Sequence, residues 1–153
     1  MHHRIAAWSG LLLAVCAVAA PAAQLPSMDP ATDQAIRSYR LDRGNTEVIL
    51  KTLKEVTAAV LKDPDWMTKI QSRMKLTLDE QCKAMESDPA TGPILKANRI
   101  SARDYSFGLL ALRAAARADA GMGVATLANP ANVSFLKANP SIVERLNAID
   151  MGK

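Results

Sequence analysis

Histidine and cysteine, which often carry catalysis or bind metals, are almost absent from this chain. The histidines are His2 and His3, at the extreme N-terminus, and the cysteines are Cys16 and Cys82. Residues 1–22 are expected to be removed, as argued below, so that Cys82 alone would remain in the mature protein. That would exclude a Ser-His-Asp or Cys-His site, a histidine-ligated zinc, a Cys-x-x-Cys-His haem attachment and a disulfide within the chain.

Carboxylates are the remaining side chains with which the chain could catalyse hydrolysis or elimination. The candidate pairs are Asp63 with Asp65, Asp79 with Glu80, and Asp104 with Asp119. All but Asp119 fall in or near a predicted first helical turn, where the helix dipole favours a carboxylate without any catalytic role. Nothing selects one pair. A small hydrolase or lyase that uses carboxylates or Tyr105 is therefore an alternative to a non-catalytic protein.

Soft metal ligands form a second possible site. Met74, Cys82 and Met85 recur at helical spacing, and thioether and thiolate groups suit an ion such as Cu(I). The same spacing is typical of a buried apolar stripe, in which Met commonly fills gaps. A Met/Cys metal or haem binder is thus a further alternative, but we expect no cofactor. A reactive Cys82 is not indicated either, because no basic residue is certain to lie beside it and lower its pKa.

The segment from Ala102 to Ala120 is the most unusual stretch. Its predicted core face consists of Tyr105, Leu109, Leu112 and Ala116, and its small residues are Gly108, Ala111, Ala114, Ala115 and Ala118. Small residues let neighbouring helices approach closely. Arg113 and Arg117 lie one turn apart on another face, with Leu110 between them. Arg103 lies lower on the same side. This strip could receive an acidic partner or the carboxylate of an amphiphile, or it is a solvated edge whose arginine stems cover apolar surface.

Short motifs between residues 82 and 139 carry a resemblance. They are Cys82, the run Ser101-Ala-Arg-Asp-Tyr105 and the run Asn132-Val-Ser-Phe135. In this order they resemble a loose group of small exported bacterial helical proteins, which implies secretion and a helical fold but brings no activity. The resemblance also implies that Arg103, Asp104, Tyr105, Asn132 and Phe135 act together. They either tie a loop to the core or line a pocket.

The N-terminus has the form of a secretory signal. Arg4 gives a positive start, residues 5–20 are largely apolar, and Ala20-Pro-Ala22 offers the small residues that a signal peptidase reads. A membrane anchor is less favoured, because the run is interrupted by serine and glycine and falls short of the roughly 20 apolar residues of a span. We therefore expect a signal peptide over residues 1–22, a single helical domain over residues 23–153, and a periplasmic or secreted location.

The charge is balanced. The formal net charge is +4, with 19 Lys and Arg against 15 Asp and Glu. Aromatic residues make up only 4% of the chain, so stacking platforms for bases are not evident. Neither feature favours a nucleic-acid partner, and no membrane span is expected once the leader is removed.

Proline pairs predict where helices begin, because Asp or Asn can cap a helix and proline suits its first position. The predicted helices are Pro30–Arg43, Thr46–Lys62, Pro64–Ser87, a short helix after Asp88 that ends at Ala97, then Ala102–Ala120, Pro130–Ala138 and Pro140–Ile149. Gly44-Asn45 is expected to end the first, and Gly121 and Gly123 the long fifth. A capping-box pattern over Thr77–Glu80 competes with continuity of the third. No strand-like alternation occurs, so the fold class is all-α, a helical bundle of about four main helices plus short C-terminal helices.

The function predicted from these patterns is an exported, non-catalytic binding or interaction module. Its partner would be an unidentified protein or a small amphiphilic or anionic ligand. The residues predicted to bind are Arg103, Tyr105, Leu110, Arg113, Arg117, Asn132 and Phe135.

Overall fold

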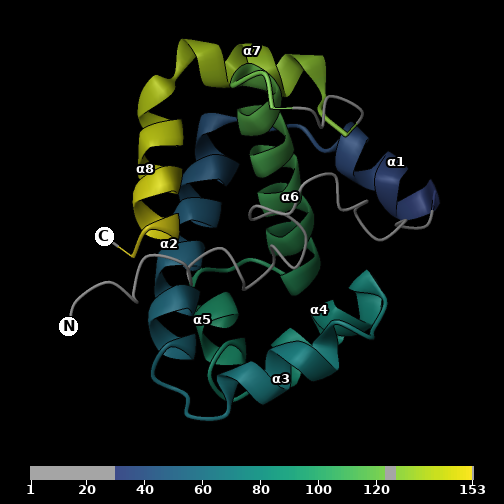
Figure 1. The fold of residues 1–153 in the computed structure, drawn as a ribbon, viewed down its shortest axis with the longest axis vertical. Coiled ribbons are helices and arrows are strands. Elements are labelled where there is room, and N and C mark those ends of the chain that lie inside the picture. The colour runs from purple at the N-terminus through teal and green to yellow at the C-terminus, as the bar shows by residue number, and fades with distance from the viewer. Residues whose placement is uncertain (1–29, 123–126, 153) are drawn as a thin grey trace.

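The computed structural model describes residues 30–122 and 127–152, and within these ranges it contains helices and no strand (Figure 1). The helices are α1 Pro30–Ser38, α2 Arg43–Val60, α3 Trp66–Arg73, α4 Leu78–Ser87, α5 Gly92–Ala97, α6 Ala102–Asp119, α7 Pro130–Ala138 and α8 Pro140–Asp150. The predicted all-α class is confirmed. The predicted leader and Gly123 lie outside the described residues.

Helix α6 lies at the centre of the arrangement. It packs against α1, α2, α4 and α7, while α8 packs against α2 and α7. Figure 1 shows α2 and α6 running side by side, with α7 across one end and α3 and α4 at the opposite end. Small residues permit this packing, because a Cβ added at Gly108 would lie 2.5 Å from Ile49 Cδ1 and 2.9 Å from the Tyr39 hydroxyl.

The main hydrophobic core joins α2, α4, α5, α6, α7 and α8. Tyr105, Leu109 and Leu112, which were predicted to face it, are fully buried on α6, and Ala116 packs against it. Ala102 and Ala115 of α6 are also buried in it, and the remaining buried members come from the segment before α2 and from α2, α4, α5, α7 and α8. A smaller cluster of Ile36, Phe107 and Ala111 joins α1 to α6. No helix in the described ranges combines the length and the apolar character needed to cross a bilayer.

The predicted helix from Pro30 to Arg43 is wrong beyond Ser38. The Asn132 side chain accepts a hydrogen bond from the Leu41 amide at 2.9 Å and donates one to the Tyr39 carbonyl at 2.8 Å. These bonds fix a non-helical segment between α1 and α2. Gly44-Asn45 does not end a helix but lies in the first turn of α2, where the Asn45 amide donates to Asp42 at 2.8 Å in a capping box.

The predicted continuous helix from Pro64 to Ser87 is also wrong. Helix α3 ends at Arg73, and α4 begins after Thr77, whose amide donates to the Glu80 carboxylate at 2.8 Å. The Glu80 amide donates in return to the Thr77 hydroxyl at 3.3 Å. The capping box therefore prevails over the apolar periodicity. Met74, at the end of α3, is 52% exposed.

Candidate functional site

The arginines of the predicted basic strip lie in different surroundings. Arg103, in the first turn of α6, is 57% exposed, forms an ion pair with Asp79 and covers the Phe107 ring at 4.5 Å from its centroid. Arg113 lies ten residues further along α6, roughly 15 Å by helical rise, and its side chain is only 14% exposed. Arg117 is half-buried in the last turn. Arg103 is therefore remote from Arg113.

Arg113 and Asp150 form a partly buried ion pair between α6 and the last residue of α8. Nη2 of Arg113 lies 2.6 Å from Oδ1 of Asp150, and the two side chains are 14% and 30% exposed. Nε and Nη1 of Arg113 are buried without a hydrogen-bond partner among the described residues. A buried donor without an acceptor costs about 1–3 kcal/mol, and more when the group is charged. This guanidinium therefore has unused capacity to hold an acceptor.

Tyr105 adds a second unused donor to the same region. Its side chain is fully buried, and its hydroxyl has no hydrogen-bond partner in the described part of the chain. Burial raises the pKa of the Tyr105 phenol far above its ordinary value, while the Arg113 charge lowers that pKa and the Asp150 charge raises it. The phenol therefore stays protonated at physiological pH and can donate a hydrogen bond, but it cannot serve as a general base.

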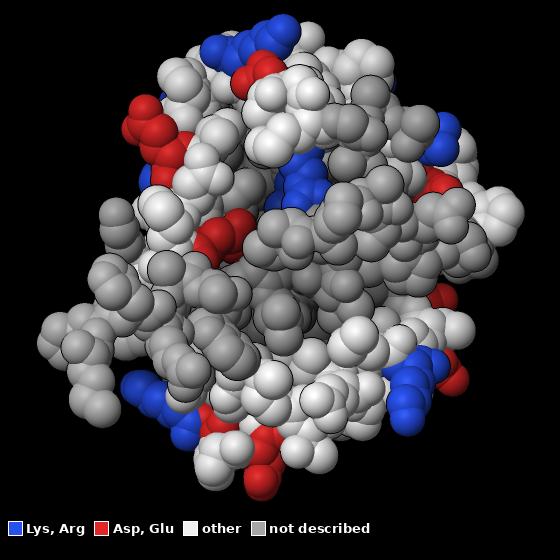
Figure 2. Space-filling model, in the orientation of Figure 1, with Lys and Arg blue, Asp and Glu red and all other residues white. Residues whose placement is uncertain are grey.

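On the face drawn in Figure 2, basic atoms lie in the upper middle, at the position of α6 in Figure 1, and acidic atoms lie to their left. Apolar residues adjoin the Arg113–Asp150 pair in sequence: Ala116 and Ile149 are partly buried and pack against the core. A charged pair next to partly exposed apolar side chains suits a ligand with an anionic head and an apolar body.

The other predicted binding residues lie in separate places. Leu110 packs beside the smaller cluster that faces α1. Asn132 is buried, and its side chain is occupied by Leu41 and Tyr39. Phe135 is partly buried against the main core, to which Tyr105 also belongs. The structure therefore places Tyr105 and Arg113 near Asp150, and gives Asn132 a role in holding the chain between α1 and α2.

Asp150 was missed in the sequence-based prediction. It lies 37 residues from Arg113, and the sequence pattern placed the end of the last helix one residue before it. No local pattern reports such a pairing.

The proposed carboxylate pairs are engaged in structural contacts. Five of the six candidate acids have a polar partner: Lys69 for Asp63, Arg103 for Asp79, Thr77 for Glu80, Ser101 for Asp104 and Lys137 for Asp119. The side-chain hydrogen bond from Lys69 lowers the pKa of Asp63, and the Thr77 amide lowers the pKa of Glu80. Both shifts run opposite to that of a general acid working near neutral pH.

The proposed soft-metal residues do not share one stripe. Cys82 and Met85 are buried on α4, whereas Met74 lies beyond the helix break on an exposed end of α3. Burial raises the pKa of the Cys82 thiol, so its reactive thiolate form is disfavoured. No group of three or more His, Cys, Asp and Glu in the described ranges is placed to hold a metal ion.

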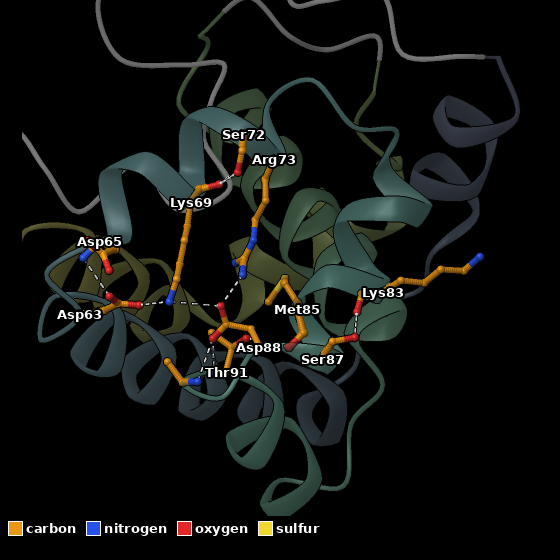
Figure 3. Close-up of polar contacts among 11 residues, drawn as sticks. Asp63, Asp65, Lys69, Ser72, Arg73, Lys83, Met85, Ser87, Asp88 and Thr91 are labelled. Carbon is orange, nitrogen blue, oxygen red and sulfur yellow. Dashed lines mark hydrogen bonds and ion pairs between the residues drawn. The ribbon is translucent and has the colours of Figure 1, made fainter.

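A second polar cluster, formed by Asp63, Lys69, Arg73 and Asp88, fastens α3 to the junction between α4 and α5. Arg73 Nη2 lies 2.5 Å, and Lys69 Nζ 3.9 Å, from Oδ2 of Asp88, and Lys69 also pairs with Asp63. Figure 3 shows Lys69 and Arg73 pointing from α3 toward Asp88. Ile70 is the buried residue of α3, so charge contributes much of the attachment of this helix. The sequence had indicated Asp88 only as a helix start.

Comparison with protein-family models, with curated proteins and with solved structures gives no match for this chain. The resemblance to small exported bacterial proteins therefore stays a prediction, and the site is interpreted from its own residues.

Proposed function

We propose that this chain is an exported, non-catalytic binding module that receives an anionic group at Arg113, between α6 and α8. The observation that carries the proposal is that the described residues offer no acceptor to three buried donors, Nε and Nη1 of Arg113 and the hydroxyl of Tyr105. An anionic acceptor would supply the missing hydrogen bonds in a setting of low dielectric, where such bonds are strong.

The proposed class of ligand follows from the residues around Arg113. One guanidinium suits one anionic head, and the partly buried Ala116 and Ile149 offer apolar contact for the remainder. The balanced net charge of +4 gives no reason to propose a nucleic acid. Export rests on the predicted signal peptide, and N-terminal sequencing of the secreted or periplasmic protein should find Ala23 as the first residue.

Thermal denaturation with a panel of small anions tests the binding site. Acetate, octanoate, phosphate and sulfate would be added to the mature chain and to the Arg113→Ala and Arg103→Ala variants. At 100 times Kd a ligand stabilises the folded state by about 2.7 kcal/mol, so at least one anion should raise Tm by several degrees. Arg103→Ala, the matched control on the same helix, should keep this response and Arg113→Ala should lose it.

Two results would contradict the proposed site. The first is a panel in which no anion raises Tm, and the second is an equal response of wild type and Arg113→Ala. Either would leave Arg113 as a structural residue whose remaining donors are satisfied by water.

A further inference from the structure

We propose that the anionic group is a carboxylate and that Asp150 is a built-in competitor for it. This inference rests on the proposed function, because it concerns the same guanidinium. Asp150 already places a carboxylate oxygen 2.6 Å from Nη2 of Arg113. Asp150 thus shows that a carboxylate can bind at this side of the guanidinium.

The Asp150 contact uses the guanidinium incompletely. Only Nη2 of Arg113 is engaged, while Nε and Nη1 lack partners among the described residues. A carboxylate bound to arginine commonly forms two parallel hydrogen bonds. A free carboxylate, unconstrained by a helix backbone, can reach that geometry and also approach donors that Asp150 leaves unused. Exchange of Asp150 for a ligand carboxylate therefore adds hydrogen bonds without adding net charge beside Arg113.

Asp150 lies at a position from which its side chain can move away from Arg113. It is the last residue of α8, and Gly152 follows in the left-handed region with φ +71. Its side chain is 30% exposed, so the displaced carboxylate can turn to water at modest cost. Helix ends open more readily than helix interiors. Ligand binding would therefore loosen the last turn of α8.

The apolar neighbours narrow the ligand further. Ala116 on α6 and Ile149 on α8 are only partly buried and lie close in sequence to the two charged residues. The ligand class is accordingly a monocarboxylate with an apolar chain, and octanoate is a suitable probe.

Calorimetric titration of octanoate into the full mature chain tests the competition. Asp150→Asn removes the competing charge and should bind octanoate roughly two- to fivefold more tightly, because a partly exposed ion pair contributes on this order to an equilibrium constant. Asp119→Asn also removes one negative charge, but from a carboxylate on α6 that lies 3.9 Å from Lys137 and is not paired with Arg113. This matched control should bind as wild type does, and Arg113→Gln should not bind.

Amide hydrogen exchange supplies a second readout that does not depend on a variant. The Met151 and Gly152 amides donate to Asn147 and Ile149 in the unliganded chain. Saturation with octanoate should accelerate exchange at these two amides. Far-UV circular dichroism checks that Asp150→Asn stays helical. If that variant does not fold, the exchange measurement on wild type is the test of whether octanoate displaces Asp150.

The outcomes separate the inference from the proposed function. Weaker or unchanged octanoate binding by folded Asp150→Asn, or unchanged exchange at the end of α8 on saturation, overturns the competition. Binding of inorganic phosphate at Arg113 without binding of octanoate overturns the carboxylate class and leaves the anion site intact. Failure of octanoate, acetate, phosphate and sulfate to bind wild type or Asp150→Asn overturns both.

Discussion

Replacement of Asp88 by alanine should destabilise the fold by about 3 kcal/mol. Oδ1 of Asp88 accepts from the amides of Ala90 at 2.8 Å and Thr91 at 3.2 Å, and Oδ2 accepts from Arg73 at 2.5 Å. A hydrogen bond to a charged group contributes about 1.5–3 kcal/mol, and all three bonds end on one charged carboxylate. We take about 3 kcal/mol in total, less than the full sum, because contributions of bonds that share one group do not add fully and because the side chains of Arg73 and Lys69 keep 20% and 38% exposure to water.

The charge on Asp88 gives this prediction a pH dependence. Burial alone would raise the pKa of Asp88, but the Ala90 and Thr91 amides and the Arg73 guanidinium together hold it below its ordinary value. The stabilisation is therefore complete above pH ~4 and is lost as the pH falls through the lowered folded-state pKa. Asp88→Asn keeps an acceptor but no charge, so its stability deficit should shrink below pH ~4.

Urea denaturation followed by circular dichroism, at pH 7 and at several values down to pH 2.5, measures both effects. At pH 7 Asp88→Ala should also lower Tm by roughly 10 °C, from about 4 °C per kcal/mol for a domain of this size. Asp79→Ala is the matched control, because that acid is 64% exposed in its pair with Arg103, and it should cost less than about 1 kcal/mol. A deficit under about 0.5 kcal/mol for Asp88→Ala, or an Asp88→Asn deficit that stays constant to pH 2.5, would refute this reasoning.

Three further substitutions have definite expected effects. Gly108→Ala should destabilise the chain by about 1–2 kcal/mol, because overpacking against Ile49 at 2.5 Å exceeds the gain in helix propensity; chemical denaturation measures the balance, and a more stable variant would contradict the close packing. Asn132→Ala should cost about 2–3 kcal/mol by leaving buried backbone groups unpaired, and hydrogen exchange at the Leu41 amide should accelerate; an unchanged rate would contradict the tie. Arg103→Ala should shift Tm by no more than a few degrees, since its ion pair is exposed, and a larger fall in a thermal scan would show that its contact with Phe107 was undervalued.

Local chemistry made much of the fold predictable. Pro30, Pro130 and Pro140 begin helices as predicted, and Ser101 caps α6 by accepting a bond from the Asp104 amide. Each of these signals acts within a few residues of the backbone that it stabilises. The class of the fold and the position of its central helix therefore follow from short-range patterns.

The rule that an Asp-Pro pair begins a helix failed at Asp63 and Asp88, because these carboxylates accept hydrogen bonds within a turn. Asp63 accepts from the Asp65 amide and Asp88 from the Ala90 amide, so each carboxylate stabilises a turn first. Helices α3 and α5 consequently begin later, at Trp66 and Gly92. The first predicted helix failed for a different reason, because its end is fixed by Asn132, more than 90 residues away.

The candidate site was predictable only in part. Tyr105 was selected through the resemblance and Arg113 through its place on the basic strip, and both are predicted binding residues with unpaired buried donors in the described chain. Sequence spacing placed Arg103 and Leu110 on the same strip, but Arg103 pairs with α4 and Leu110 packs toward α1. Helical spacing gives a residue's direction, whereas the partner that occupies that direction is set by the tertiary fold.

The resonance of the Arg113 Nε–H group in an NMR titration tests the central claim most directly. Comparison of ¹⁵N spectra of wild type and Arg113→Lys assigns the signal, and octanoate is then added to the full mature chain. If a ligand carboxylate binds this guanidinium, the Nε–H signal should shift and its exchange with water should slow as octanoate saturates the site. Saturable octanoate binding that moves signals elsewhere and leaves the Arg113 Nε–H signal unchanged would contradict the claim.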